Sequence, residues 1–254
     1  METTSSRWAG RTAVVTGASA GIGAAVCVRL ARAGLRVVGL ARRPELVDKL
    51  SSELADADGS GGSIVSRACD VSVPAQVAAA FRWVEDTCGP VHVLVNNAGV
   101  FHKADFTDLG NQKMSDDDLM ATIDINLKGT IMCARRALDS MTKSGVDGYI
   151  ININSVAGHY IPLSRGFNVY PSSKHAVTAF TLGLLNELAI FQSNIKVTSV
   201  SPALVATAMV GQLPAGTPAL RPADVADAVL YLLATPPSVN ITELTITAVG
   251  DKRL

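Results

Sequence analysis

Short, almost wholly apolar runs recur along the chain, and longer stretches of mixed character separate them. The first six runs are nearly continuous in their apolar residues, which is typical of strands that are buried on both faces of a sheet. Their shortness and their β-branched residues favour strands over helices. The pattern predicts seven strands, at 12–17, 35–41, 63–71, 91–99, 148–155, 195–202 and 241–249.

The stretches between these runs have the spacing of amphipathic helices. Ile22, Val26 and Leu30 repeat every four residues. Gly34 then stands where a helix ends. Helices are predicted at 21–33, 44–54, 74–87, 115–143, 171–193 and 222–234.

This alternation of strands and helices predicts the fold class. It implies right-handed crossovers and a doubly wound, mostly parallel sheet with helices on both faces. The expected fold is therefore α/β, a seven-stranded Rossmann fold. Because no linker divides the chain, residues 1–254 are predicted to form a single domain.

The composition indicates a folded chain that does not bind nucleic acid. Of the 254 residues, 48% are hydrophobic and 17% are charged, which is enough apolar material for a large core. Lys and Arg number 22, and Asp and Glu also number 22, so the net charge is zero. Nucleic-acid partners usually demand a basic surface, which this balance argues against.

The cysteines and the first residues point away from a metal site and a membrane segment. The four cysteines lie far apart, no two form a CxxC pair, and the four histidines do not cluster. We expect reduced thiols and no metal. The start, METTSSRWAGR, is polar, and the apolar run after it is too short for a signal anchor or a membrane span. A soluble, cytoplasmic protein without integral membrane contact is expected.

The segment TGASAGIG, residues 16–23, follows the first predicted strand and opens the first predicted helix. Glycines let the backbone approach a pyrophosphate, and the helix N-terminus offers free N–H groups and a partial positive charge. A plain tight turn is the alternative, but the strand–turn–helix context favours a dinucleotide site. The predicted cofactor contacts are Gly17, Ser19, Gly21, Ile22 and Gly23.

The end of the second predicted strand indicates which dinucleotide binds. An acidic residue there favours NAD, and a basic one accommodates the extra phosphate of NADP. Here Ala41 replaces the acid and Arg42 and Arg43 follow, which predicts NADP(H) with Arg42 forked onto the phosphate. A solvated pair of arginines is the alternative. Asp70 and Val71, after the third strand, are further predicted contacts, with Asp70 either accepting from the adenine amino group or capping a helix.

Tyr170 and Lys174, in YPSSK, have the spacing of neighbours on one helix face. An alcohol that loses a hydride must also lose a proton, so an acid/base group has to contact its oxygen. Tyrosine is a poor base at its free pKa of about 10, but the charges of Lys174 and of an oxidised nicotinamide favour the phenolate by about two to three pKa units. Pro171 is expected to leave Tyr170 at the mouth of the helix that holds Lys174. The alternative is a tyrosine and a lysine that merely share a helix face.

Ser155 and Asn126 are the other candidate catalytic residues. Ser155 ends the fifth strand, where its hydroxyl either donates to the substrate oxygen as charge develops or caps the backbone. Asn126 stands inside a predicted helix, where asparagine is mildly unfavourable, and this misfit indicates a function.

TGASAGIG, NNAG at 96–99, Asn126, Ser155 and YPSSK together resemble the short-chain dehydrogenase/reductase family, from about residue 9 to residue 249. Within it, RWAGRTAVVTGASAGIGAAV, ININSVAGH and ATPPSVNITELTITAVG are similar to a branch that includes insect farnesol dehydrogenases and a vertebrate ketosteroid reductase. The resemblance implies an oxidoreductase that acts on CH–OH donors. Its implied catalytic set is Asn126, Ser155, Tyr170 and Lys174.

The resemblance also implies how residues are used. Lys174 would bind the nicotinamide ribose as well, and Asn126 would hold a water that relays protons to Lys174. The NNAG segment would line the adenine-ribose side, and residues of SPALVATAM, 201–209, would face the nicotinamide carboxamide, although Ala203 replaces the usual glycine. The further predicted cofactor contacts are Asn97, Ala98, Gly99, Pro202, Val205 and Thr207, in addition to Tyr170 and Lys174.

Segment 203–221 is where the family places a substrate lid, and here it is short and mostly apolar. With 158–167 it would line a pocket for a lipid-like molecule, contacted by His159, Phe167 and Leu204. We expect NADP(H)-dependent interconversion of an alcohol and a carbonyl on an isoprenoid or steroid-like substrate, for example farnesol to farnesal. The alternatives are NADPH-dependent reduction of ketosteroids or small dicarbonyls, and a sensor that binds NADP(H) without chemistry.

Two predicted helices also indicate self-association. In relatives, the helices that correspond to 115–143 and 171–193 pair with their copies in a partner subunit. The apolar faces in LMATIDINL and AFTLGLLNELAIF are rich enough for this pairing, although they also fit packing against the sheet. We expect a homodimer or a homotetramer.

Overall fold

The computed structural model describes residues 7–57, 61–110 and 112–251. Its centre is one seven-stranded sheet in the order β3-β2-β1-β4-β5-β6-β7, in which every neighbouring pair is parallel. The predicted fold class is confirmed. The strands are β1 (Thr12–Thr16), β2 (Arg36–Ala41), β3 (Ser63–Ala68), β4 (Val91–Asn96), β5 (Tyr149–Ile153), β6 (Lys196–Pro202) and β7 (Glu243–Ile246).

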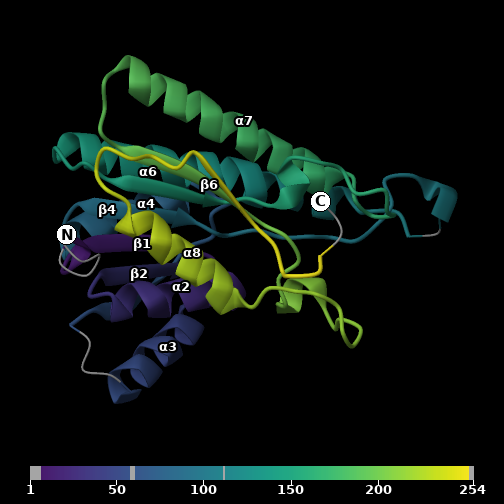
Figure 1. The fold of residues 1–254 in the computed structure, drawn as a ribbon, viewed down its shortest axis with the longest axis horizontal. Coiled ribbons are helices and arrows are strands. Elements are labelled where there is room, and N and C mark those ends of the chain that lie inside the picture. The colour runs from purple at the N-terminus through teal and green to yellow at the C-terminus, as the bar shows by residue number, and fades with distance from the viewer. Residues whose placement is uncertain (1–6, 58–60, 111, 252–254) are drawn as a thin grey trace.

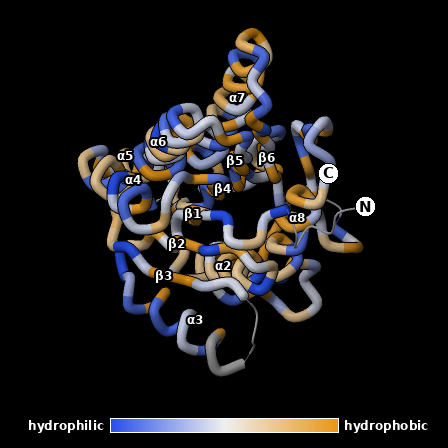
Figure 2. Tube along the Cα trace, turned by 90° about the vertical axis from the view of Figure 1, so that its left-hand side faces the viewer, coloured by the Kyte–Doolittle hydropathy of each residue, from blue (hydrophilic) through white to orange (hydrophobic). Residues whose placement is uncertain are grey.

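Helices cover both faces of the sheet, as the apolar runs predict. Figure 2 shows α4, α6 and α7 on one side and α2, α3 and α8 on the other. The principal helices are α2 (Gly21–Arg32), α3 (Pro44–Ala57), α4 (Pro74–Cys88), α5 (Asp116–Ile123), α6 (Thr130–Lys143), α7 (Val169–Ile190) and α8 (Pro222–Ala234). None of the helices among the described residues has both the length and the apolar character needed to cross a membrane.

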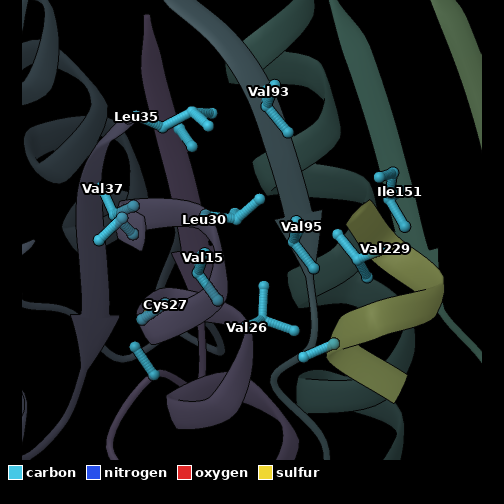
Figure 3. Packing of buried hydrophobic residues seen from close by; sticks show 14 of the residues in the cluster. Val15, Val26, Cys27, Leu30, Leu35, Val37, Val93, Val95, Ile151 and Val229 are labelled. Atoms are coloured by element: carbon cyan, nitrogen blue, oxygen red, sulfur yellow. The ribbon is translucent and has the colours of Figure 1, made fainter. Parts of the chain in front are cut away.

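Successive strand residues face the two helical layers in turn, which explains the continuous apolar runs. Val15 belongs to the core cluster under α2 and α8, while its neighbour Val14 belongs to the cluster under α4, α6 and α7. Figure 3 shows the first of these clusters, where Val26 and Leu30 of α2 pack against the strands. Burial of each such side chain contributes about 1.5–3 kcal/mol. The sheet is therefore a rigid support for the loops at its edge.

The strand order reverses between β1 and β4, and this reversal locates the site. β2 and β3 lie on one side of β1, and β4 to β7 lie on the other. The connections therefore diverge beyond the carboxyl ends of β1 and β4, where doubly wound sheets leave a crevice. The long segments that follow β4 and β6 extend toward the right-hand side of Figure 1.

Two helices differ from their predicted form. The predicted helix 115–143 is interrupted by a π-helical turn over Asp124–Gly129, labelled η2. Helix α7 starts at Val169 and not at residue 171, so Tyr170 lies inside its first turn and not before it. The prediction from Pro171 was wrong because the first N–H groups of a helix have no intrahelical partner, and a proline in the first turn therefore removes no hydrogen bond.

Candidate active site

A cavity of about 800 Å³ opens at the carboxyl edge of the sheet. It is lined by the segments that follow β1, β2, β3, β4, β5 and β6 and by the start of α7. Most of the predicted site residues are brought together here. The predicted cofactor and substrate contacts among the lining residues are Gly17, Ser19, Gly21, Ile22, Arg42, Arg43, Asp70, Val71, Asn97, Ala98, Gly99, Phe167, Tyr170, Lys174, Pro202, Leu204, Val205 and Thr207.

The turn between β1 and α2 forms part of the cavity wall. Gly17 and Gly21 have φ angles of +65° and +56°, a left-handed conformation that side chains with a Cβ rarely adopt. A Cβ on Gly17 would also lie 2.9 Å from the Cα of Ala98. The backbone of this turn and the first N–H groups of α2 thus lie at the cavity, where they can bind an anionic phosphate.

Gly23 lies where α2 packs closely on the end of β1. It is not among the residues that line the cavity. A Cβ there would lie 2.3 Å from the carbonyl oxygen of Gly17 and 2.5 Å from Nδ2 of Asn97. Gly23 therefore lets α2 pack tightly on the end of β1, and its contact with the cofactor stays a prediction.

Thr16, which the sequence reasoning missed, ties this turn to the end of β4. Its Oγ1 accepts from the backbone N–H groups of Asn97 at 2.9 Å and Ala98 at 3.0 Å. In return, Nδ2 of Asn97 donates to the Thr16 carbonyl at 2.9 Å. Thr16 is the strand residue directly before Gly17, and this position was the only signal for it.

The end of the cavity beside β2 and β3 is basic. Arg42 and Arg43 line it and are exposed, and no ion pair holds either of them within the described ranges. Ala41, which is buried, lies where an acid would exclude an extra phosphate. The two arginines are thus available to an anion at this end.

Asp70 lines the same end, but one of its oxygens is already used. Oδ1 accepts from the backbone N–H of Ser72 at 2.9 Å and from its hydroxyl at 2.6 Å, which forms a turn before α4. Burial raises the pKa of Asp70, but the bonds from Ser72 and the charge of Arg42 hold it below its usual range. The N-cap residue of α4 is Val73, without a side-chain cap, so the alternative that Asp70 caps a helix is wrong. The adenine contact stays a prediction.

Ser155, Tyr170 and Lys174 all line the cavity, on the side of β5 and α7. Lys174 is only 6% exposed, and its Nζ donates to the carbonyl of Ile153 at 3.0 Å and lies 5.8 Å from the centroid of the Tyr170 ring. Ser155 caps the short turn η3 (Val156–Gly158), where its Oγ accepts from the N–H of Ala157 at 3.1 Å. The predicted pairing of a phenol, a lysine and a serine hydroxyl is therefore present.

The pKa shifts in this group follow from burial. Burial raises the pKa of Tyr170 above its ordinary value, and a hydrogen bond with Ser155 lowers it. Burial also lowers the pKa of Lys174 to about 8. The expected downward shift of Tyr170 is thus not produced by these residues alone, because removal of water from the phenol outweighs the bond from Ser155.

Asn126 does not line the cavity. In the π-helical turn, its Oδ1 accepts from the N–H of Val100 at 2.8 Å, and its Nδ2 donates to the Val100 carbonyl at 3.0 Å and to Ser173 Oγ at 3.1 Å. Ser173 Oγ in turn donates to the carbonyl of Tyr170 at 2.7 Å. The side chain joins the loop after β4 to the start of α7, so its misfit in a helix did mark a task. The proton relay to Lys174 stays a prediction.

Aromatic rings form the wall beside Tyr170. The ring of Phe101 lies 5.1 Å from the ring of Tyr170, edge to face, and 5.1 Å from the tilted ring of Phe167. Phe167 and Leu204, both predicted, line the cavity, whereas Phe101 was missed although it follows NNAG by only two residues. The wall next to the phenol is thus apolar.

The predicted lid closes on itself at both ends. The N–H of Leu220 donates to the Leu204 carbonyl at 2.8 Å, and the N–H of Ala206 donates to the Leu220 carbonyl at 2.8 Å. Met209 and Val210, between these ends, line the cavity. Part of segment 203–221 therefore lines the cavity, and its role as a substrate lid stays a prediction.

The ring of His159 contacts β6 and β7, and its contact with the substrate stays a prediction. It is not among the cavity-lining residues. Its Nε2 lies 2.9 Å from Ser201 Oγ on β6 and 3.4 Å from Glu243 Oε1 on β7. Because η3 turns the chain back toward the sheet, the ring is directed at β6 and β7 and away from the cavity.

Several known proteins are similar to this chain in sequence. The family model for short chain dehydrogenases matches residues 11–217. Farnesol dehydrogenase of Aedes aegypti is 46% identical over 248 residues, which cover 97% of this chain and 99% of that protein. Dehydrogenase/reductase SDR family member 11 of Homo sapiens is 37% identical over 251 residues, which cover 94% of each. 

Solved structures agree with these relatives. An alcohol dehydrogenase from the archaeon Thermococcus sibiricus, complexed with 5-hydroxy-NADP, superposes with a TM-score of 0.84 at 27% identity and covers 95% of this chain and 98% of that one. A metagenomic short-chain oxidoreductase in complex with NADP has a TM-score of 0.78 at 33% identity and covers 94% and 98%.

Proposed function

Since the chain belongs to the short chain dehydrogenase family and is an oxidoreductase, we propose that it interconverts an apolar alcohol and its carbonyl with NADP(H). The observation that carries the proposal is the meeting of Ser155, Tyr170 and Lys174 beside an aromatic wall in one cavity. The preferred substrate is an isoprenoid alcohol such as farnesol.

The residues supply the proton chemistry of this reaction. A bound nicotinamide dinucleotide supplies the acceptor or donor of the hydride. In oxidation, Tyr170 takes the proton from the alcohol oxygen, and in reduction it returns one. Ser155 donates a hydrogen bond that stabilises negative charge, either on the phenolate or on the substrate oxygen. Lys174, as a cation close to the ring, favours the phenolate further.

The lining residues fit an NADP(H) molecule. The glycine turn and the N-terminus of α2 would hold the pyrophosphate, and Lys174 would bind the nicotinamide ribose. Arg42, at the end of β2, would fork onto the ribose phosphate, since a guanidinium matches two phosphate oxygens. The absence of an acid at Ala41 and the NADP-type ligands bound to two structural neighbours support NADP(H) over NAD(H).

The apolar wall supports the substrate class. Phe101, Phe167 and Leu204 offer no charged group to a substrate, so a sugar or a charged hydroxy acid would lose hydration without replacement. An isoprenoid chain would instead bury apolar surface. The name of the Aedes aegypti relative, farnesol dehydrogenase, agrees with this class.

A panel of alcohols tests the proposal. The protein is mixed with NADP⁺ and farnesol, geraniol, hydroxysteroids or simple secondary alcohols, and NADPH formation is followed by absorbance. Turnover is expected on the isoprenoid alcohols. Activity confined to sugars or charged hydroxy acids would contradict the substrate class. Binding of NADPH without turnover of any alcohol or ketone would favour the sensor alternative.

Self-association is part of the proposal. Leu182 and Ile190 of α7 are 52% and 77% exposed, and Phe191 directly after the helix is 76% exposed. Figure 1 shows α7 along the outer edge of the molecule, with its far end standing clear of the other elements. These side chains support a homodimer or a homotetramer of cytoplasmic protein in which α7 is covered.

Light scattering tests the assembly. We expect a mass that is two or four times 26.4 kDa. Leu182→Asp should lower this mass, because an ionised carboxylate would be buried in the interface. Leu109→Asp is the matched control, since Leu109 is 95% exposed on a different element, η1 (Asp108–Gly110). A wild-type mass near 26.4 kDa would refute the assembly.

A further inference from the structure

Two asparagines at the end of β5 contact two threonines of α7 in the same way. Nδ2 of Asn152 donates to Thr181 Oγ1 at 2.9 Å, and Nδ2 of Asn154 donates to Thr178 Oγ1 at 2.8 Å. The hydroxyl of Thr181 also donates to the carbonyl four residues earlier on α7 at 2.8 Å. The one proton of the Thr178 hydroxyl is shared between the carbonyl of Lys174 at 3.2 Å and the carbonyl of Gly158 at 3.0 Å. The pairs are thus alike in chemistry and differ in where they lie along the helix.

Thr178 has one further contact that Thr181 lacks. Its Oγ1 lies 3.0 Å from the carbonyl oxygen of Gly158, the last residue of η3. A Cβ on Gly158 would lie 2.7 Å from Asn154 Nδ2 and 2.9 Å from both Thr178 Oγ1 and the Lys174 carbonyl oxygen. The turn η3 therefore lies directly on α7, about one to two helical turns from Tyr170, with no room for a side chain between them.

The same turn is fixed on its other side. His159, which follows η3, holds Ser201 Oγ of β6 at 2.9 Å. Ser201 Oγ lies 3.4 Å from Ser199 Oγ, to which Asn154 Nδ2 also donates at 3.4 Å. Asn154, His159 and Thr178 thus hold η3 between α7 and the sheet, and the residue that caps η3 is Ser155.

We propose that Asn154 and Thr178 are positioning residues, which hold η3 on α7 and thereby set the place of the Ser155 hydroxyl relative to Tyr170. The inference rests on the proposed function, in which Ser155 assists Tyr170. Ser155 belongs to the β5–η3 segment and Tyr170 to α7, so their relative position depends on the contacts between these two elements. A displacement of a reacting group by about 1 Å can lower a rate about 10²-fold.

The matched pair of threonines gives a sharp test. Thr178→Val keeps the shape of the side chain and removes the hydroxyl that holds η3. Thr181→Val makes the same change in a threonine that also holds a buried asparagine but does not contact η3. We expect Thr178→Val to lower kcat about 10- to 100-fold with an unchanged KM for NADP⁺. Thr181→Val should leave kcat unchanged and lower only the thermal stability, and Thr178→Ser, which restores a hydroxyl, should recover most of the rate.

A titration of Tyr170 tests the inference without turnover. The ultraviolet absorbance of tyrosinate is recorded against pH for each variant and for the same variant with Tyr170→Phe, and the difference reports Tyr170 alone. Because the bond with Ser155 lowers the pKa of Tyr170, its loss in Thr178→Val should move the ionisation to higher pH. Ser155 and Lys174 are the polar neighbours of the phenol, and neither is altered in this variant.

The outcomes separate the two proposals. Wild-type protein that turns over no alcohol or carbonyl contradicts the proposed function, while the titration still decides the role of Thr178. An unshifted Tyr170 and an unchanged kcat in Thr178→Val would overturn the positioning role. Equal losses in the Thr178→Val and Thr181→Val variants would also overturn it, because both would then reflect stability alone. If Thr178→Val does not fold, Thr178→Ala takes its place in the same comparison.

Discussion

Tyr170→Phe is expected to lower kcat for alcohol oxidation about 10³-fold, while NADPH still binds. General acid–base catalysis contributes about 10²- to 10⁴-fold, and the phenol oxygen is the group that exchanges the proton. The aromatic ring remains, so its edge-to-face contact with Phe101 at 5.1 Å is kept. Loss of rate with intact binding would therefore report the missing hydroxyl and not a damaged fold.

The control for this variant is binding of NADPH, followed by its fluorescence, together with the melting temperature. Both should stay close to the wild-type values, since no backbone or packing contact is removed. A Tyr170→Phe protein that keeps more than about a tenth of the wild-type kcat would contradict the assignment, because the acid/base role requires a larger loss.

The pH profile offers a second view of the same residue. Oxidation needs the phenolate, so its rate should rise as the pH increases through the pKa of Tyr170, and reduction should fall over the same range. Burial raises this pKa and the bond with Ser155 lowers it. Ser155→Ala should therefore move the rise in the oxidation rate to higher pH. A rise at the same pH in both proteins would show that Ser155 does not act on Tyr170.

The positions of the site residues along the chain were predictable because a parallel sheet brings its carboxyl ends to one edge. Gly17, Arg42 and Ser155 all follow strands, and the strands were visible as apolar runs. Once the strand order is known, these three residues are expected to lie in the same cavity. Residue spacing also predicted that Lys174 lies near Tyr170, since the two are four positions apart on α7.

The features that the sequence did not predict share a physical cause, which is that tertiary contacts override local preference. Pro171 disfavours a helical conformation at Tyr170, yet α7 starts at Val169. The sequence around Asn126 does not predict the π-helical turn. The direction of the His159 ring depends on Ser201, which is 42 residues away in the chain. The raised pKa of Tyr170 depends on burial, which a motif does not encode.

The preference for NADP(H) is expected to depend on the end of β2, where Arg42 makes few contacts with the rest of the chain. Arg42 is exposed and lines the cavity next to Asp70, whose pKa its charge helps to lower. Among the described residues, no ion pair holds the guanidinium of Arg42, so the fold does not require it. We therefore expect that the guanidinium of Arg42 serves to bind the ligand.

Arg42→Asp is expected to raise the KM for NADPH about 100-fold, which corresponds to about 2.7 kcal/mol. The variant removes a charge-assisted fork onto the ribose phosphate and puts a carboxylate in its place, and like charges at this distance repel. NADH lacks the phosphate, so its KM should stay the same or fall. Initial rates with both cofactors, measured at fixed substrate, give the ratio.

Arg82→Asp is the matched control, because Arg82 is exposed on α4, lies outside the cavity lining and undergoes the same change of charge. It should alter neither KM by more than about twofold, since separated surface charges are screened by salt. If NADPH binds Arg42→Asp as well as it binds the wild type, the arginine does not hold the phosphate. The preference for NADP(H) would then have to come from Arg43, which lines the same end of the cavity and is tested by the same substitution.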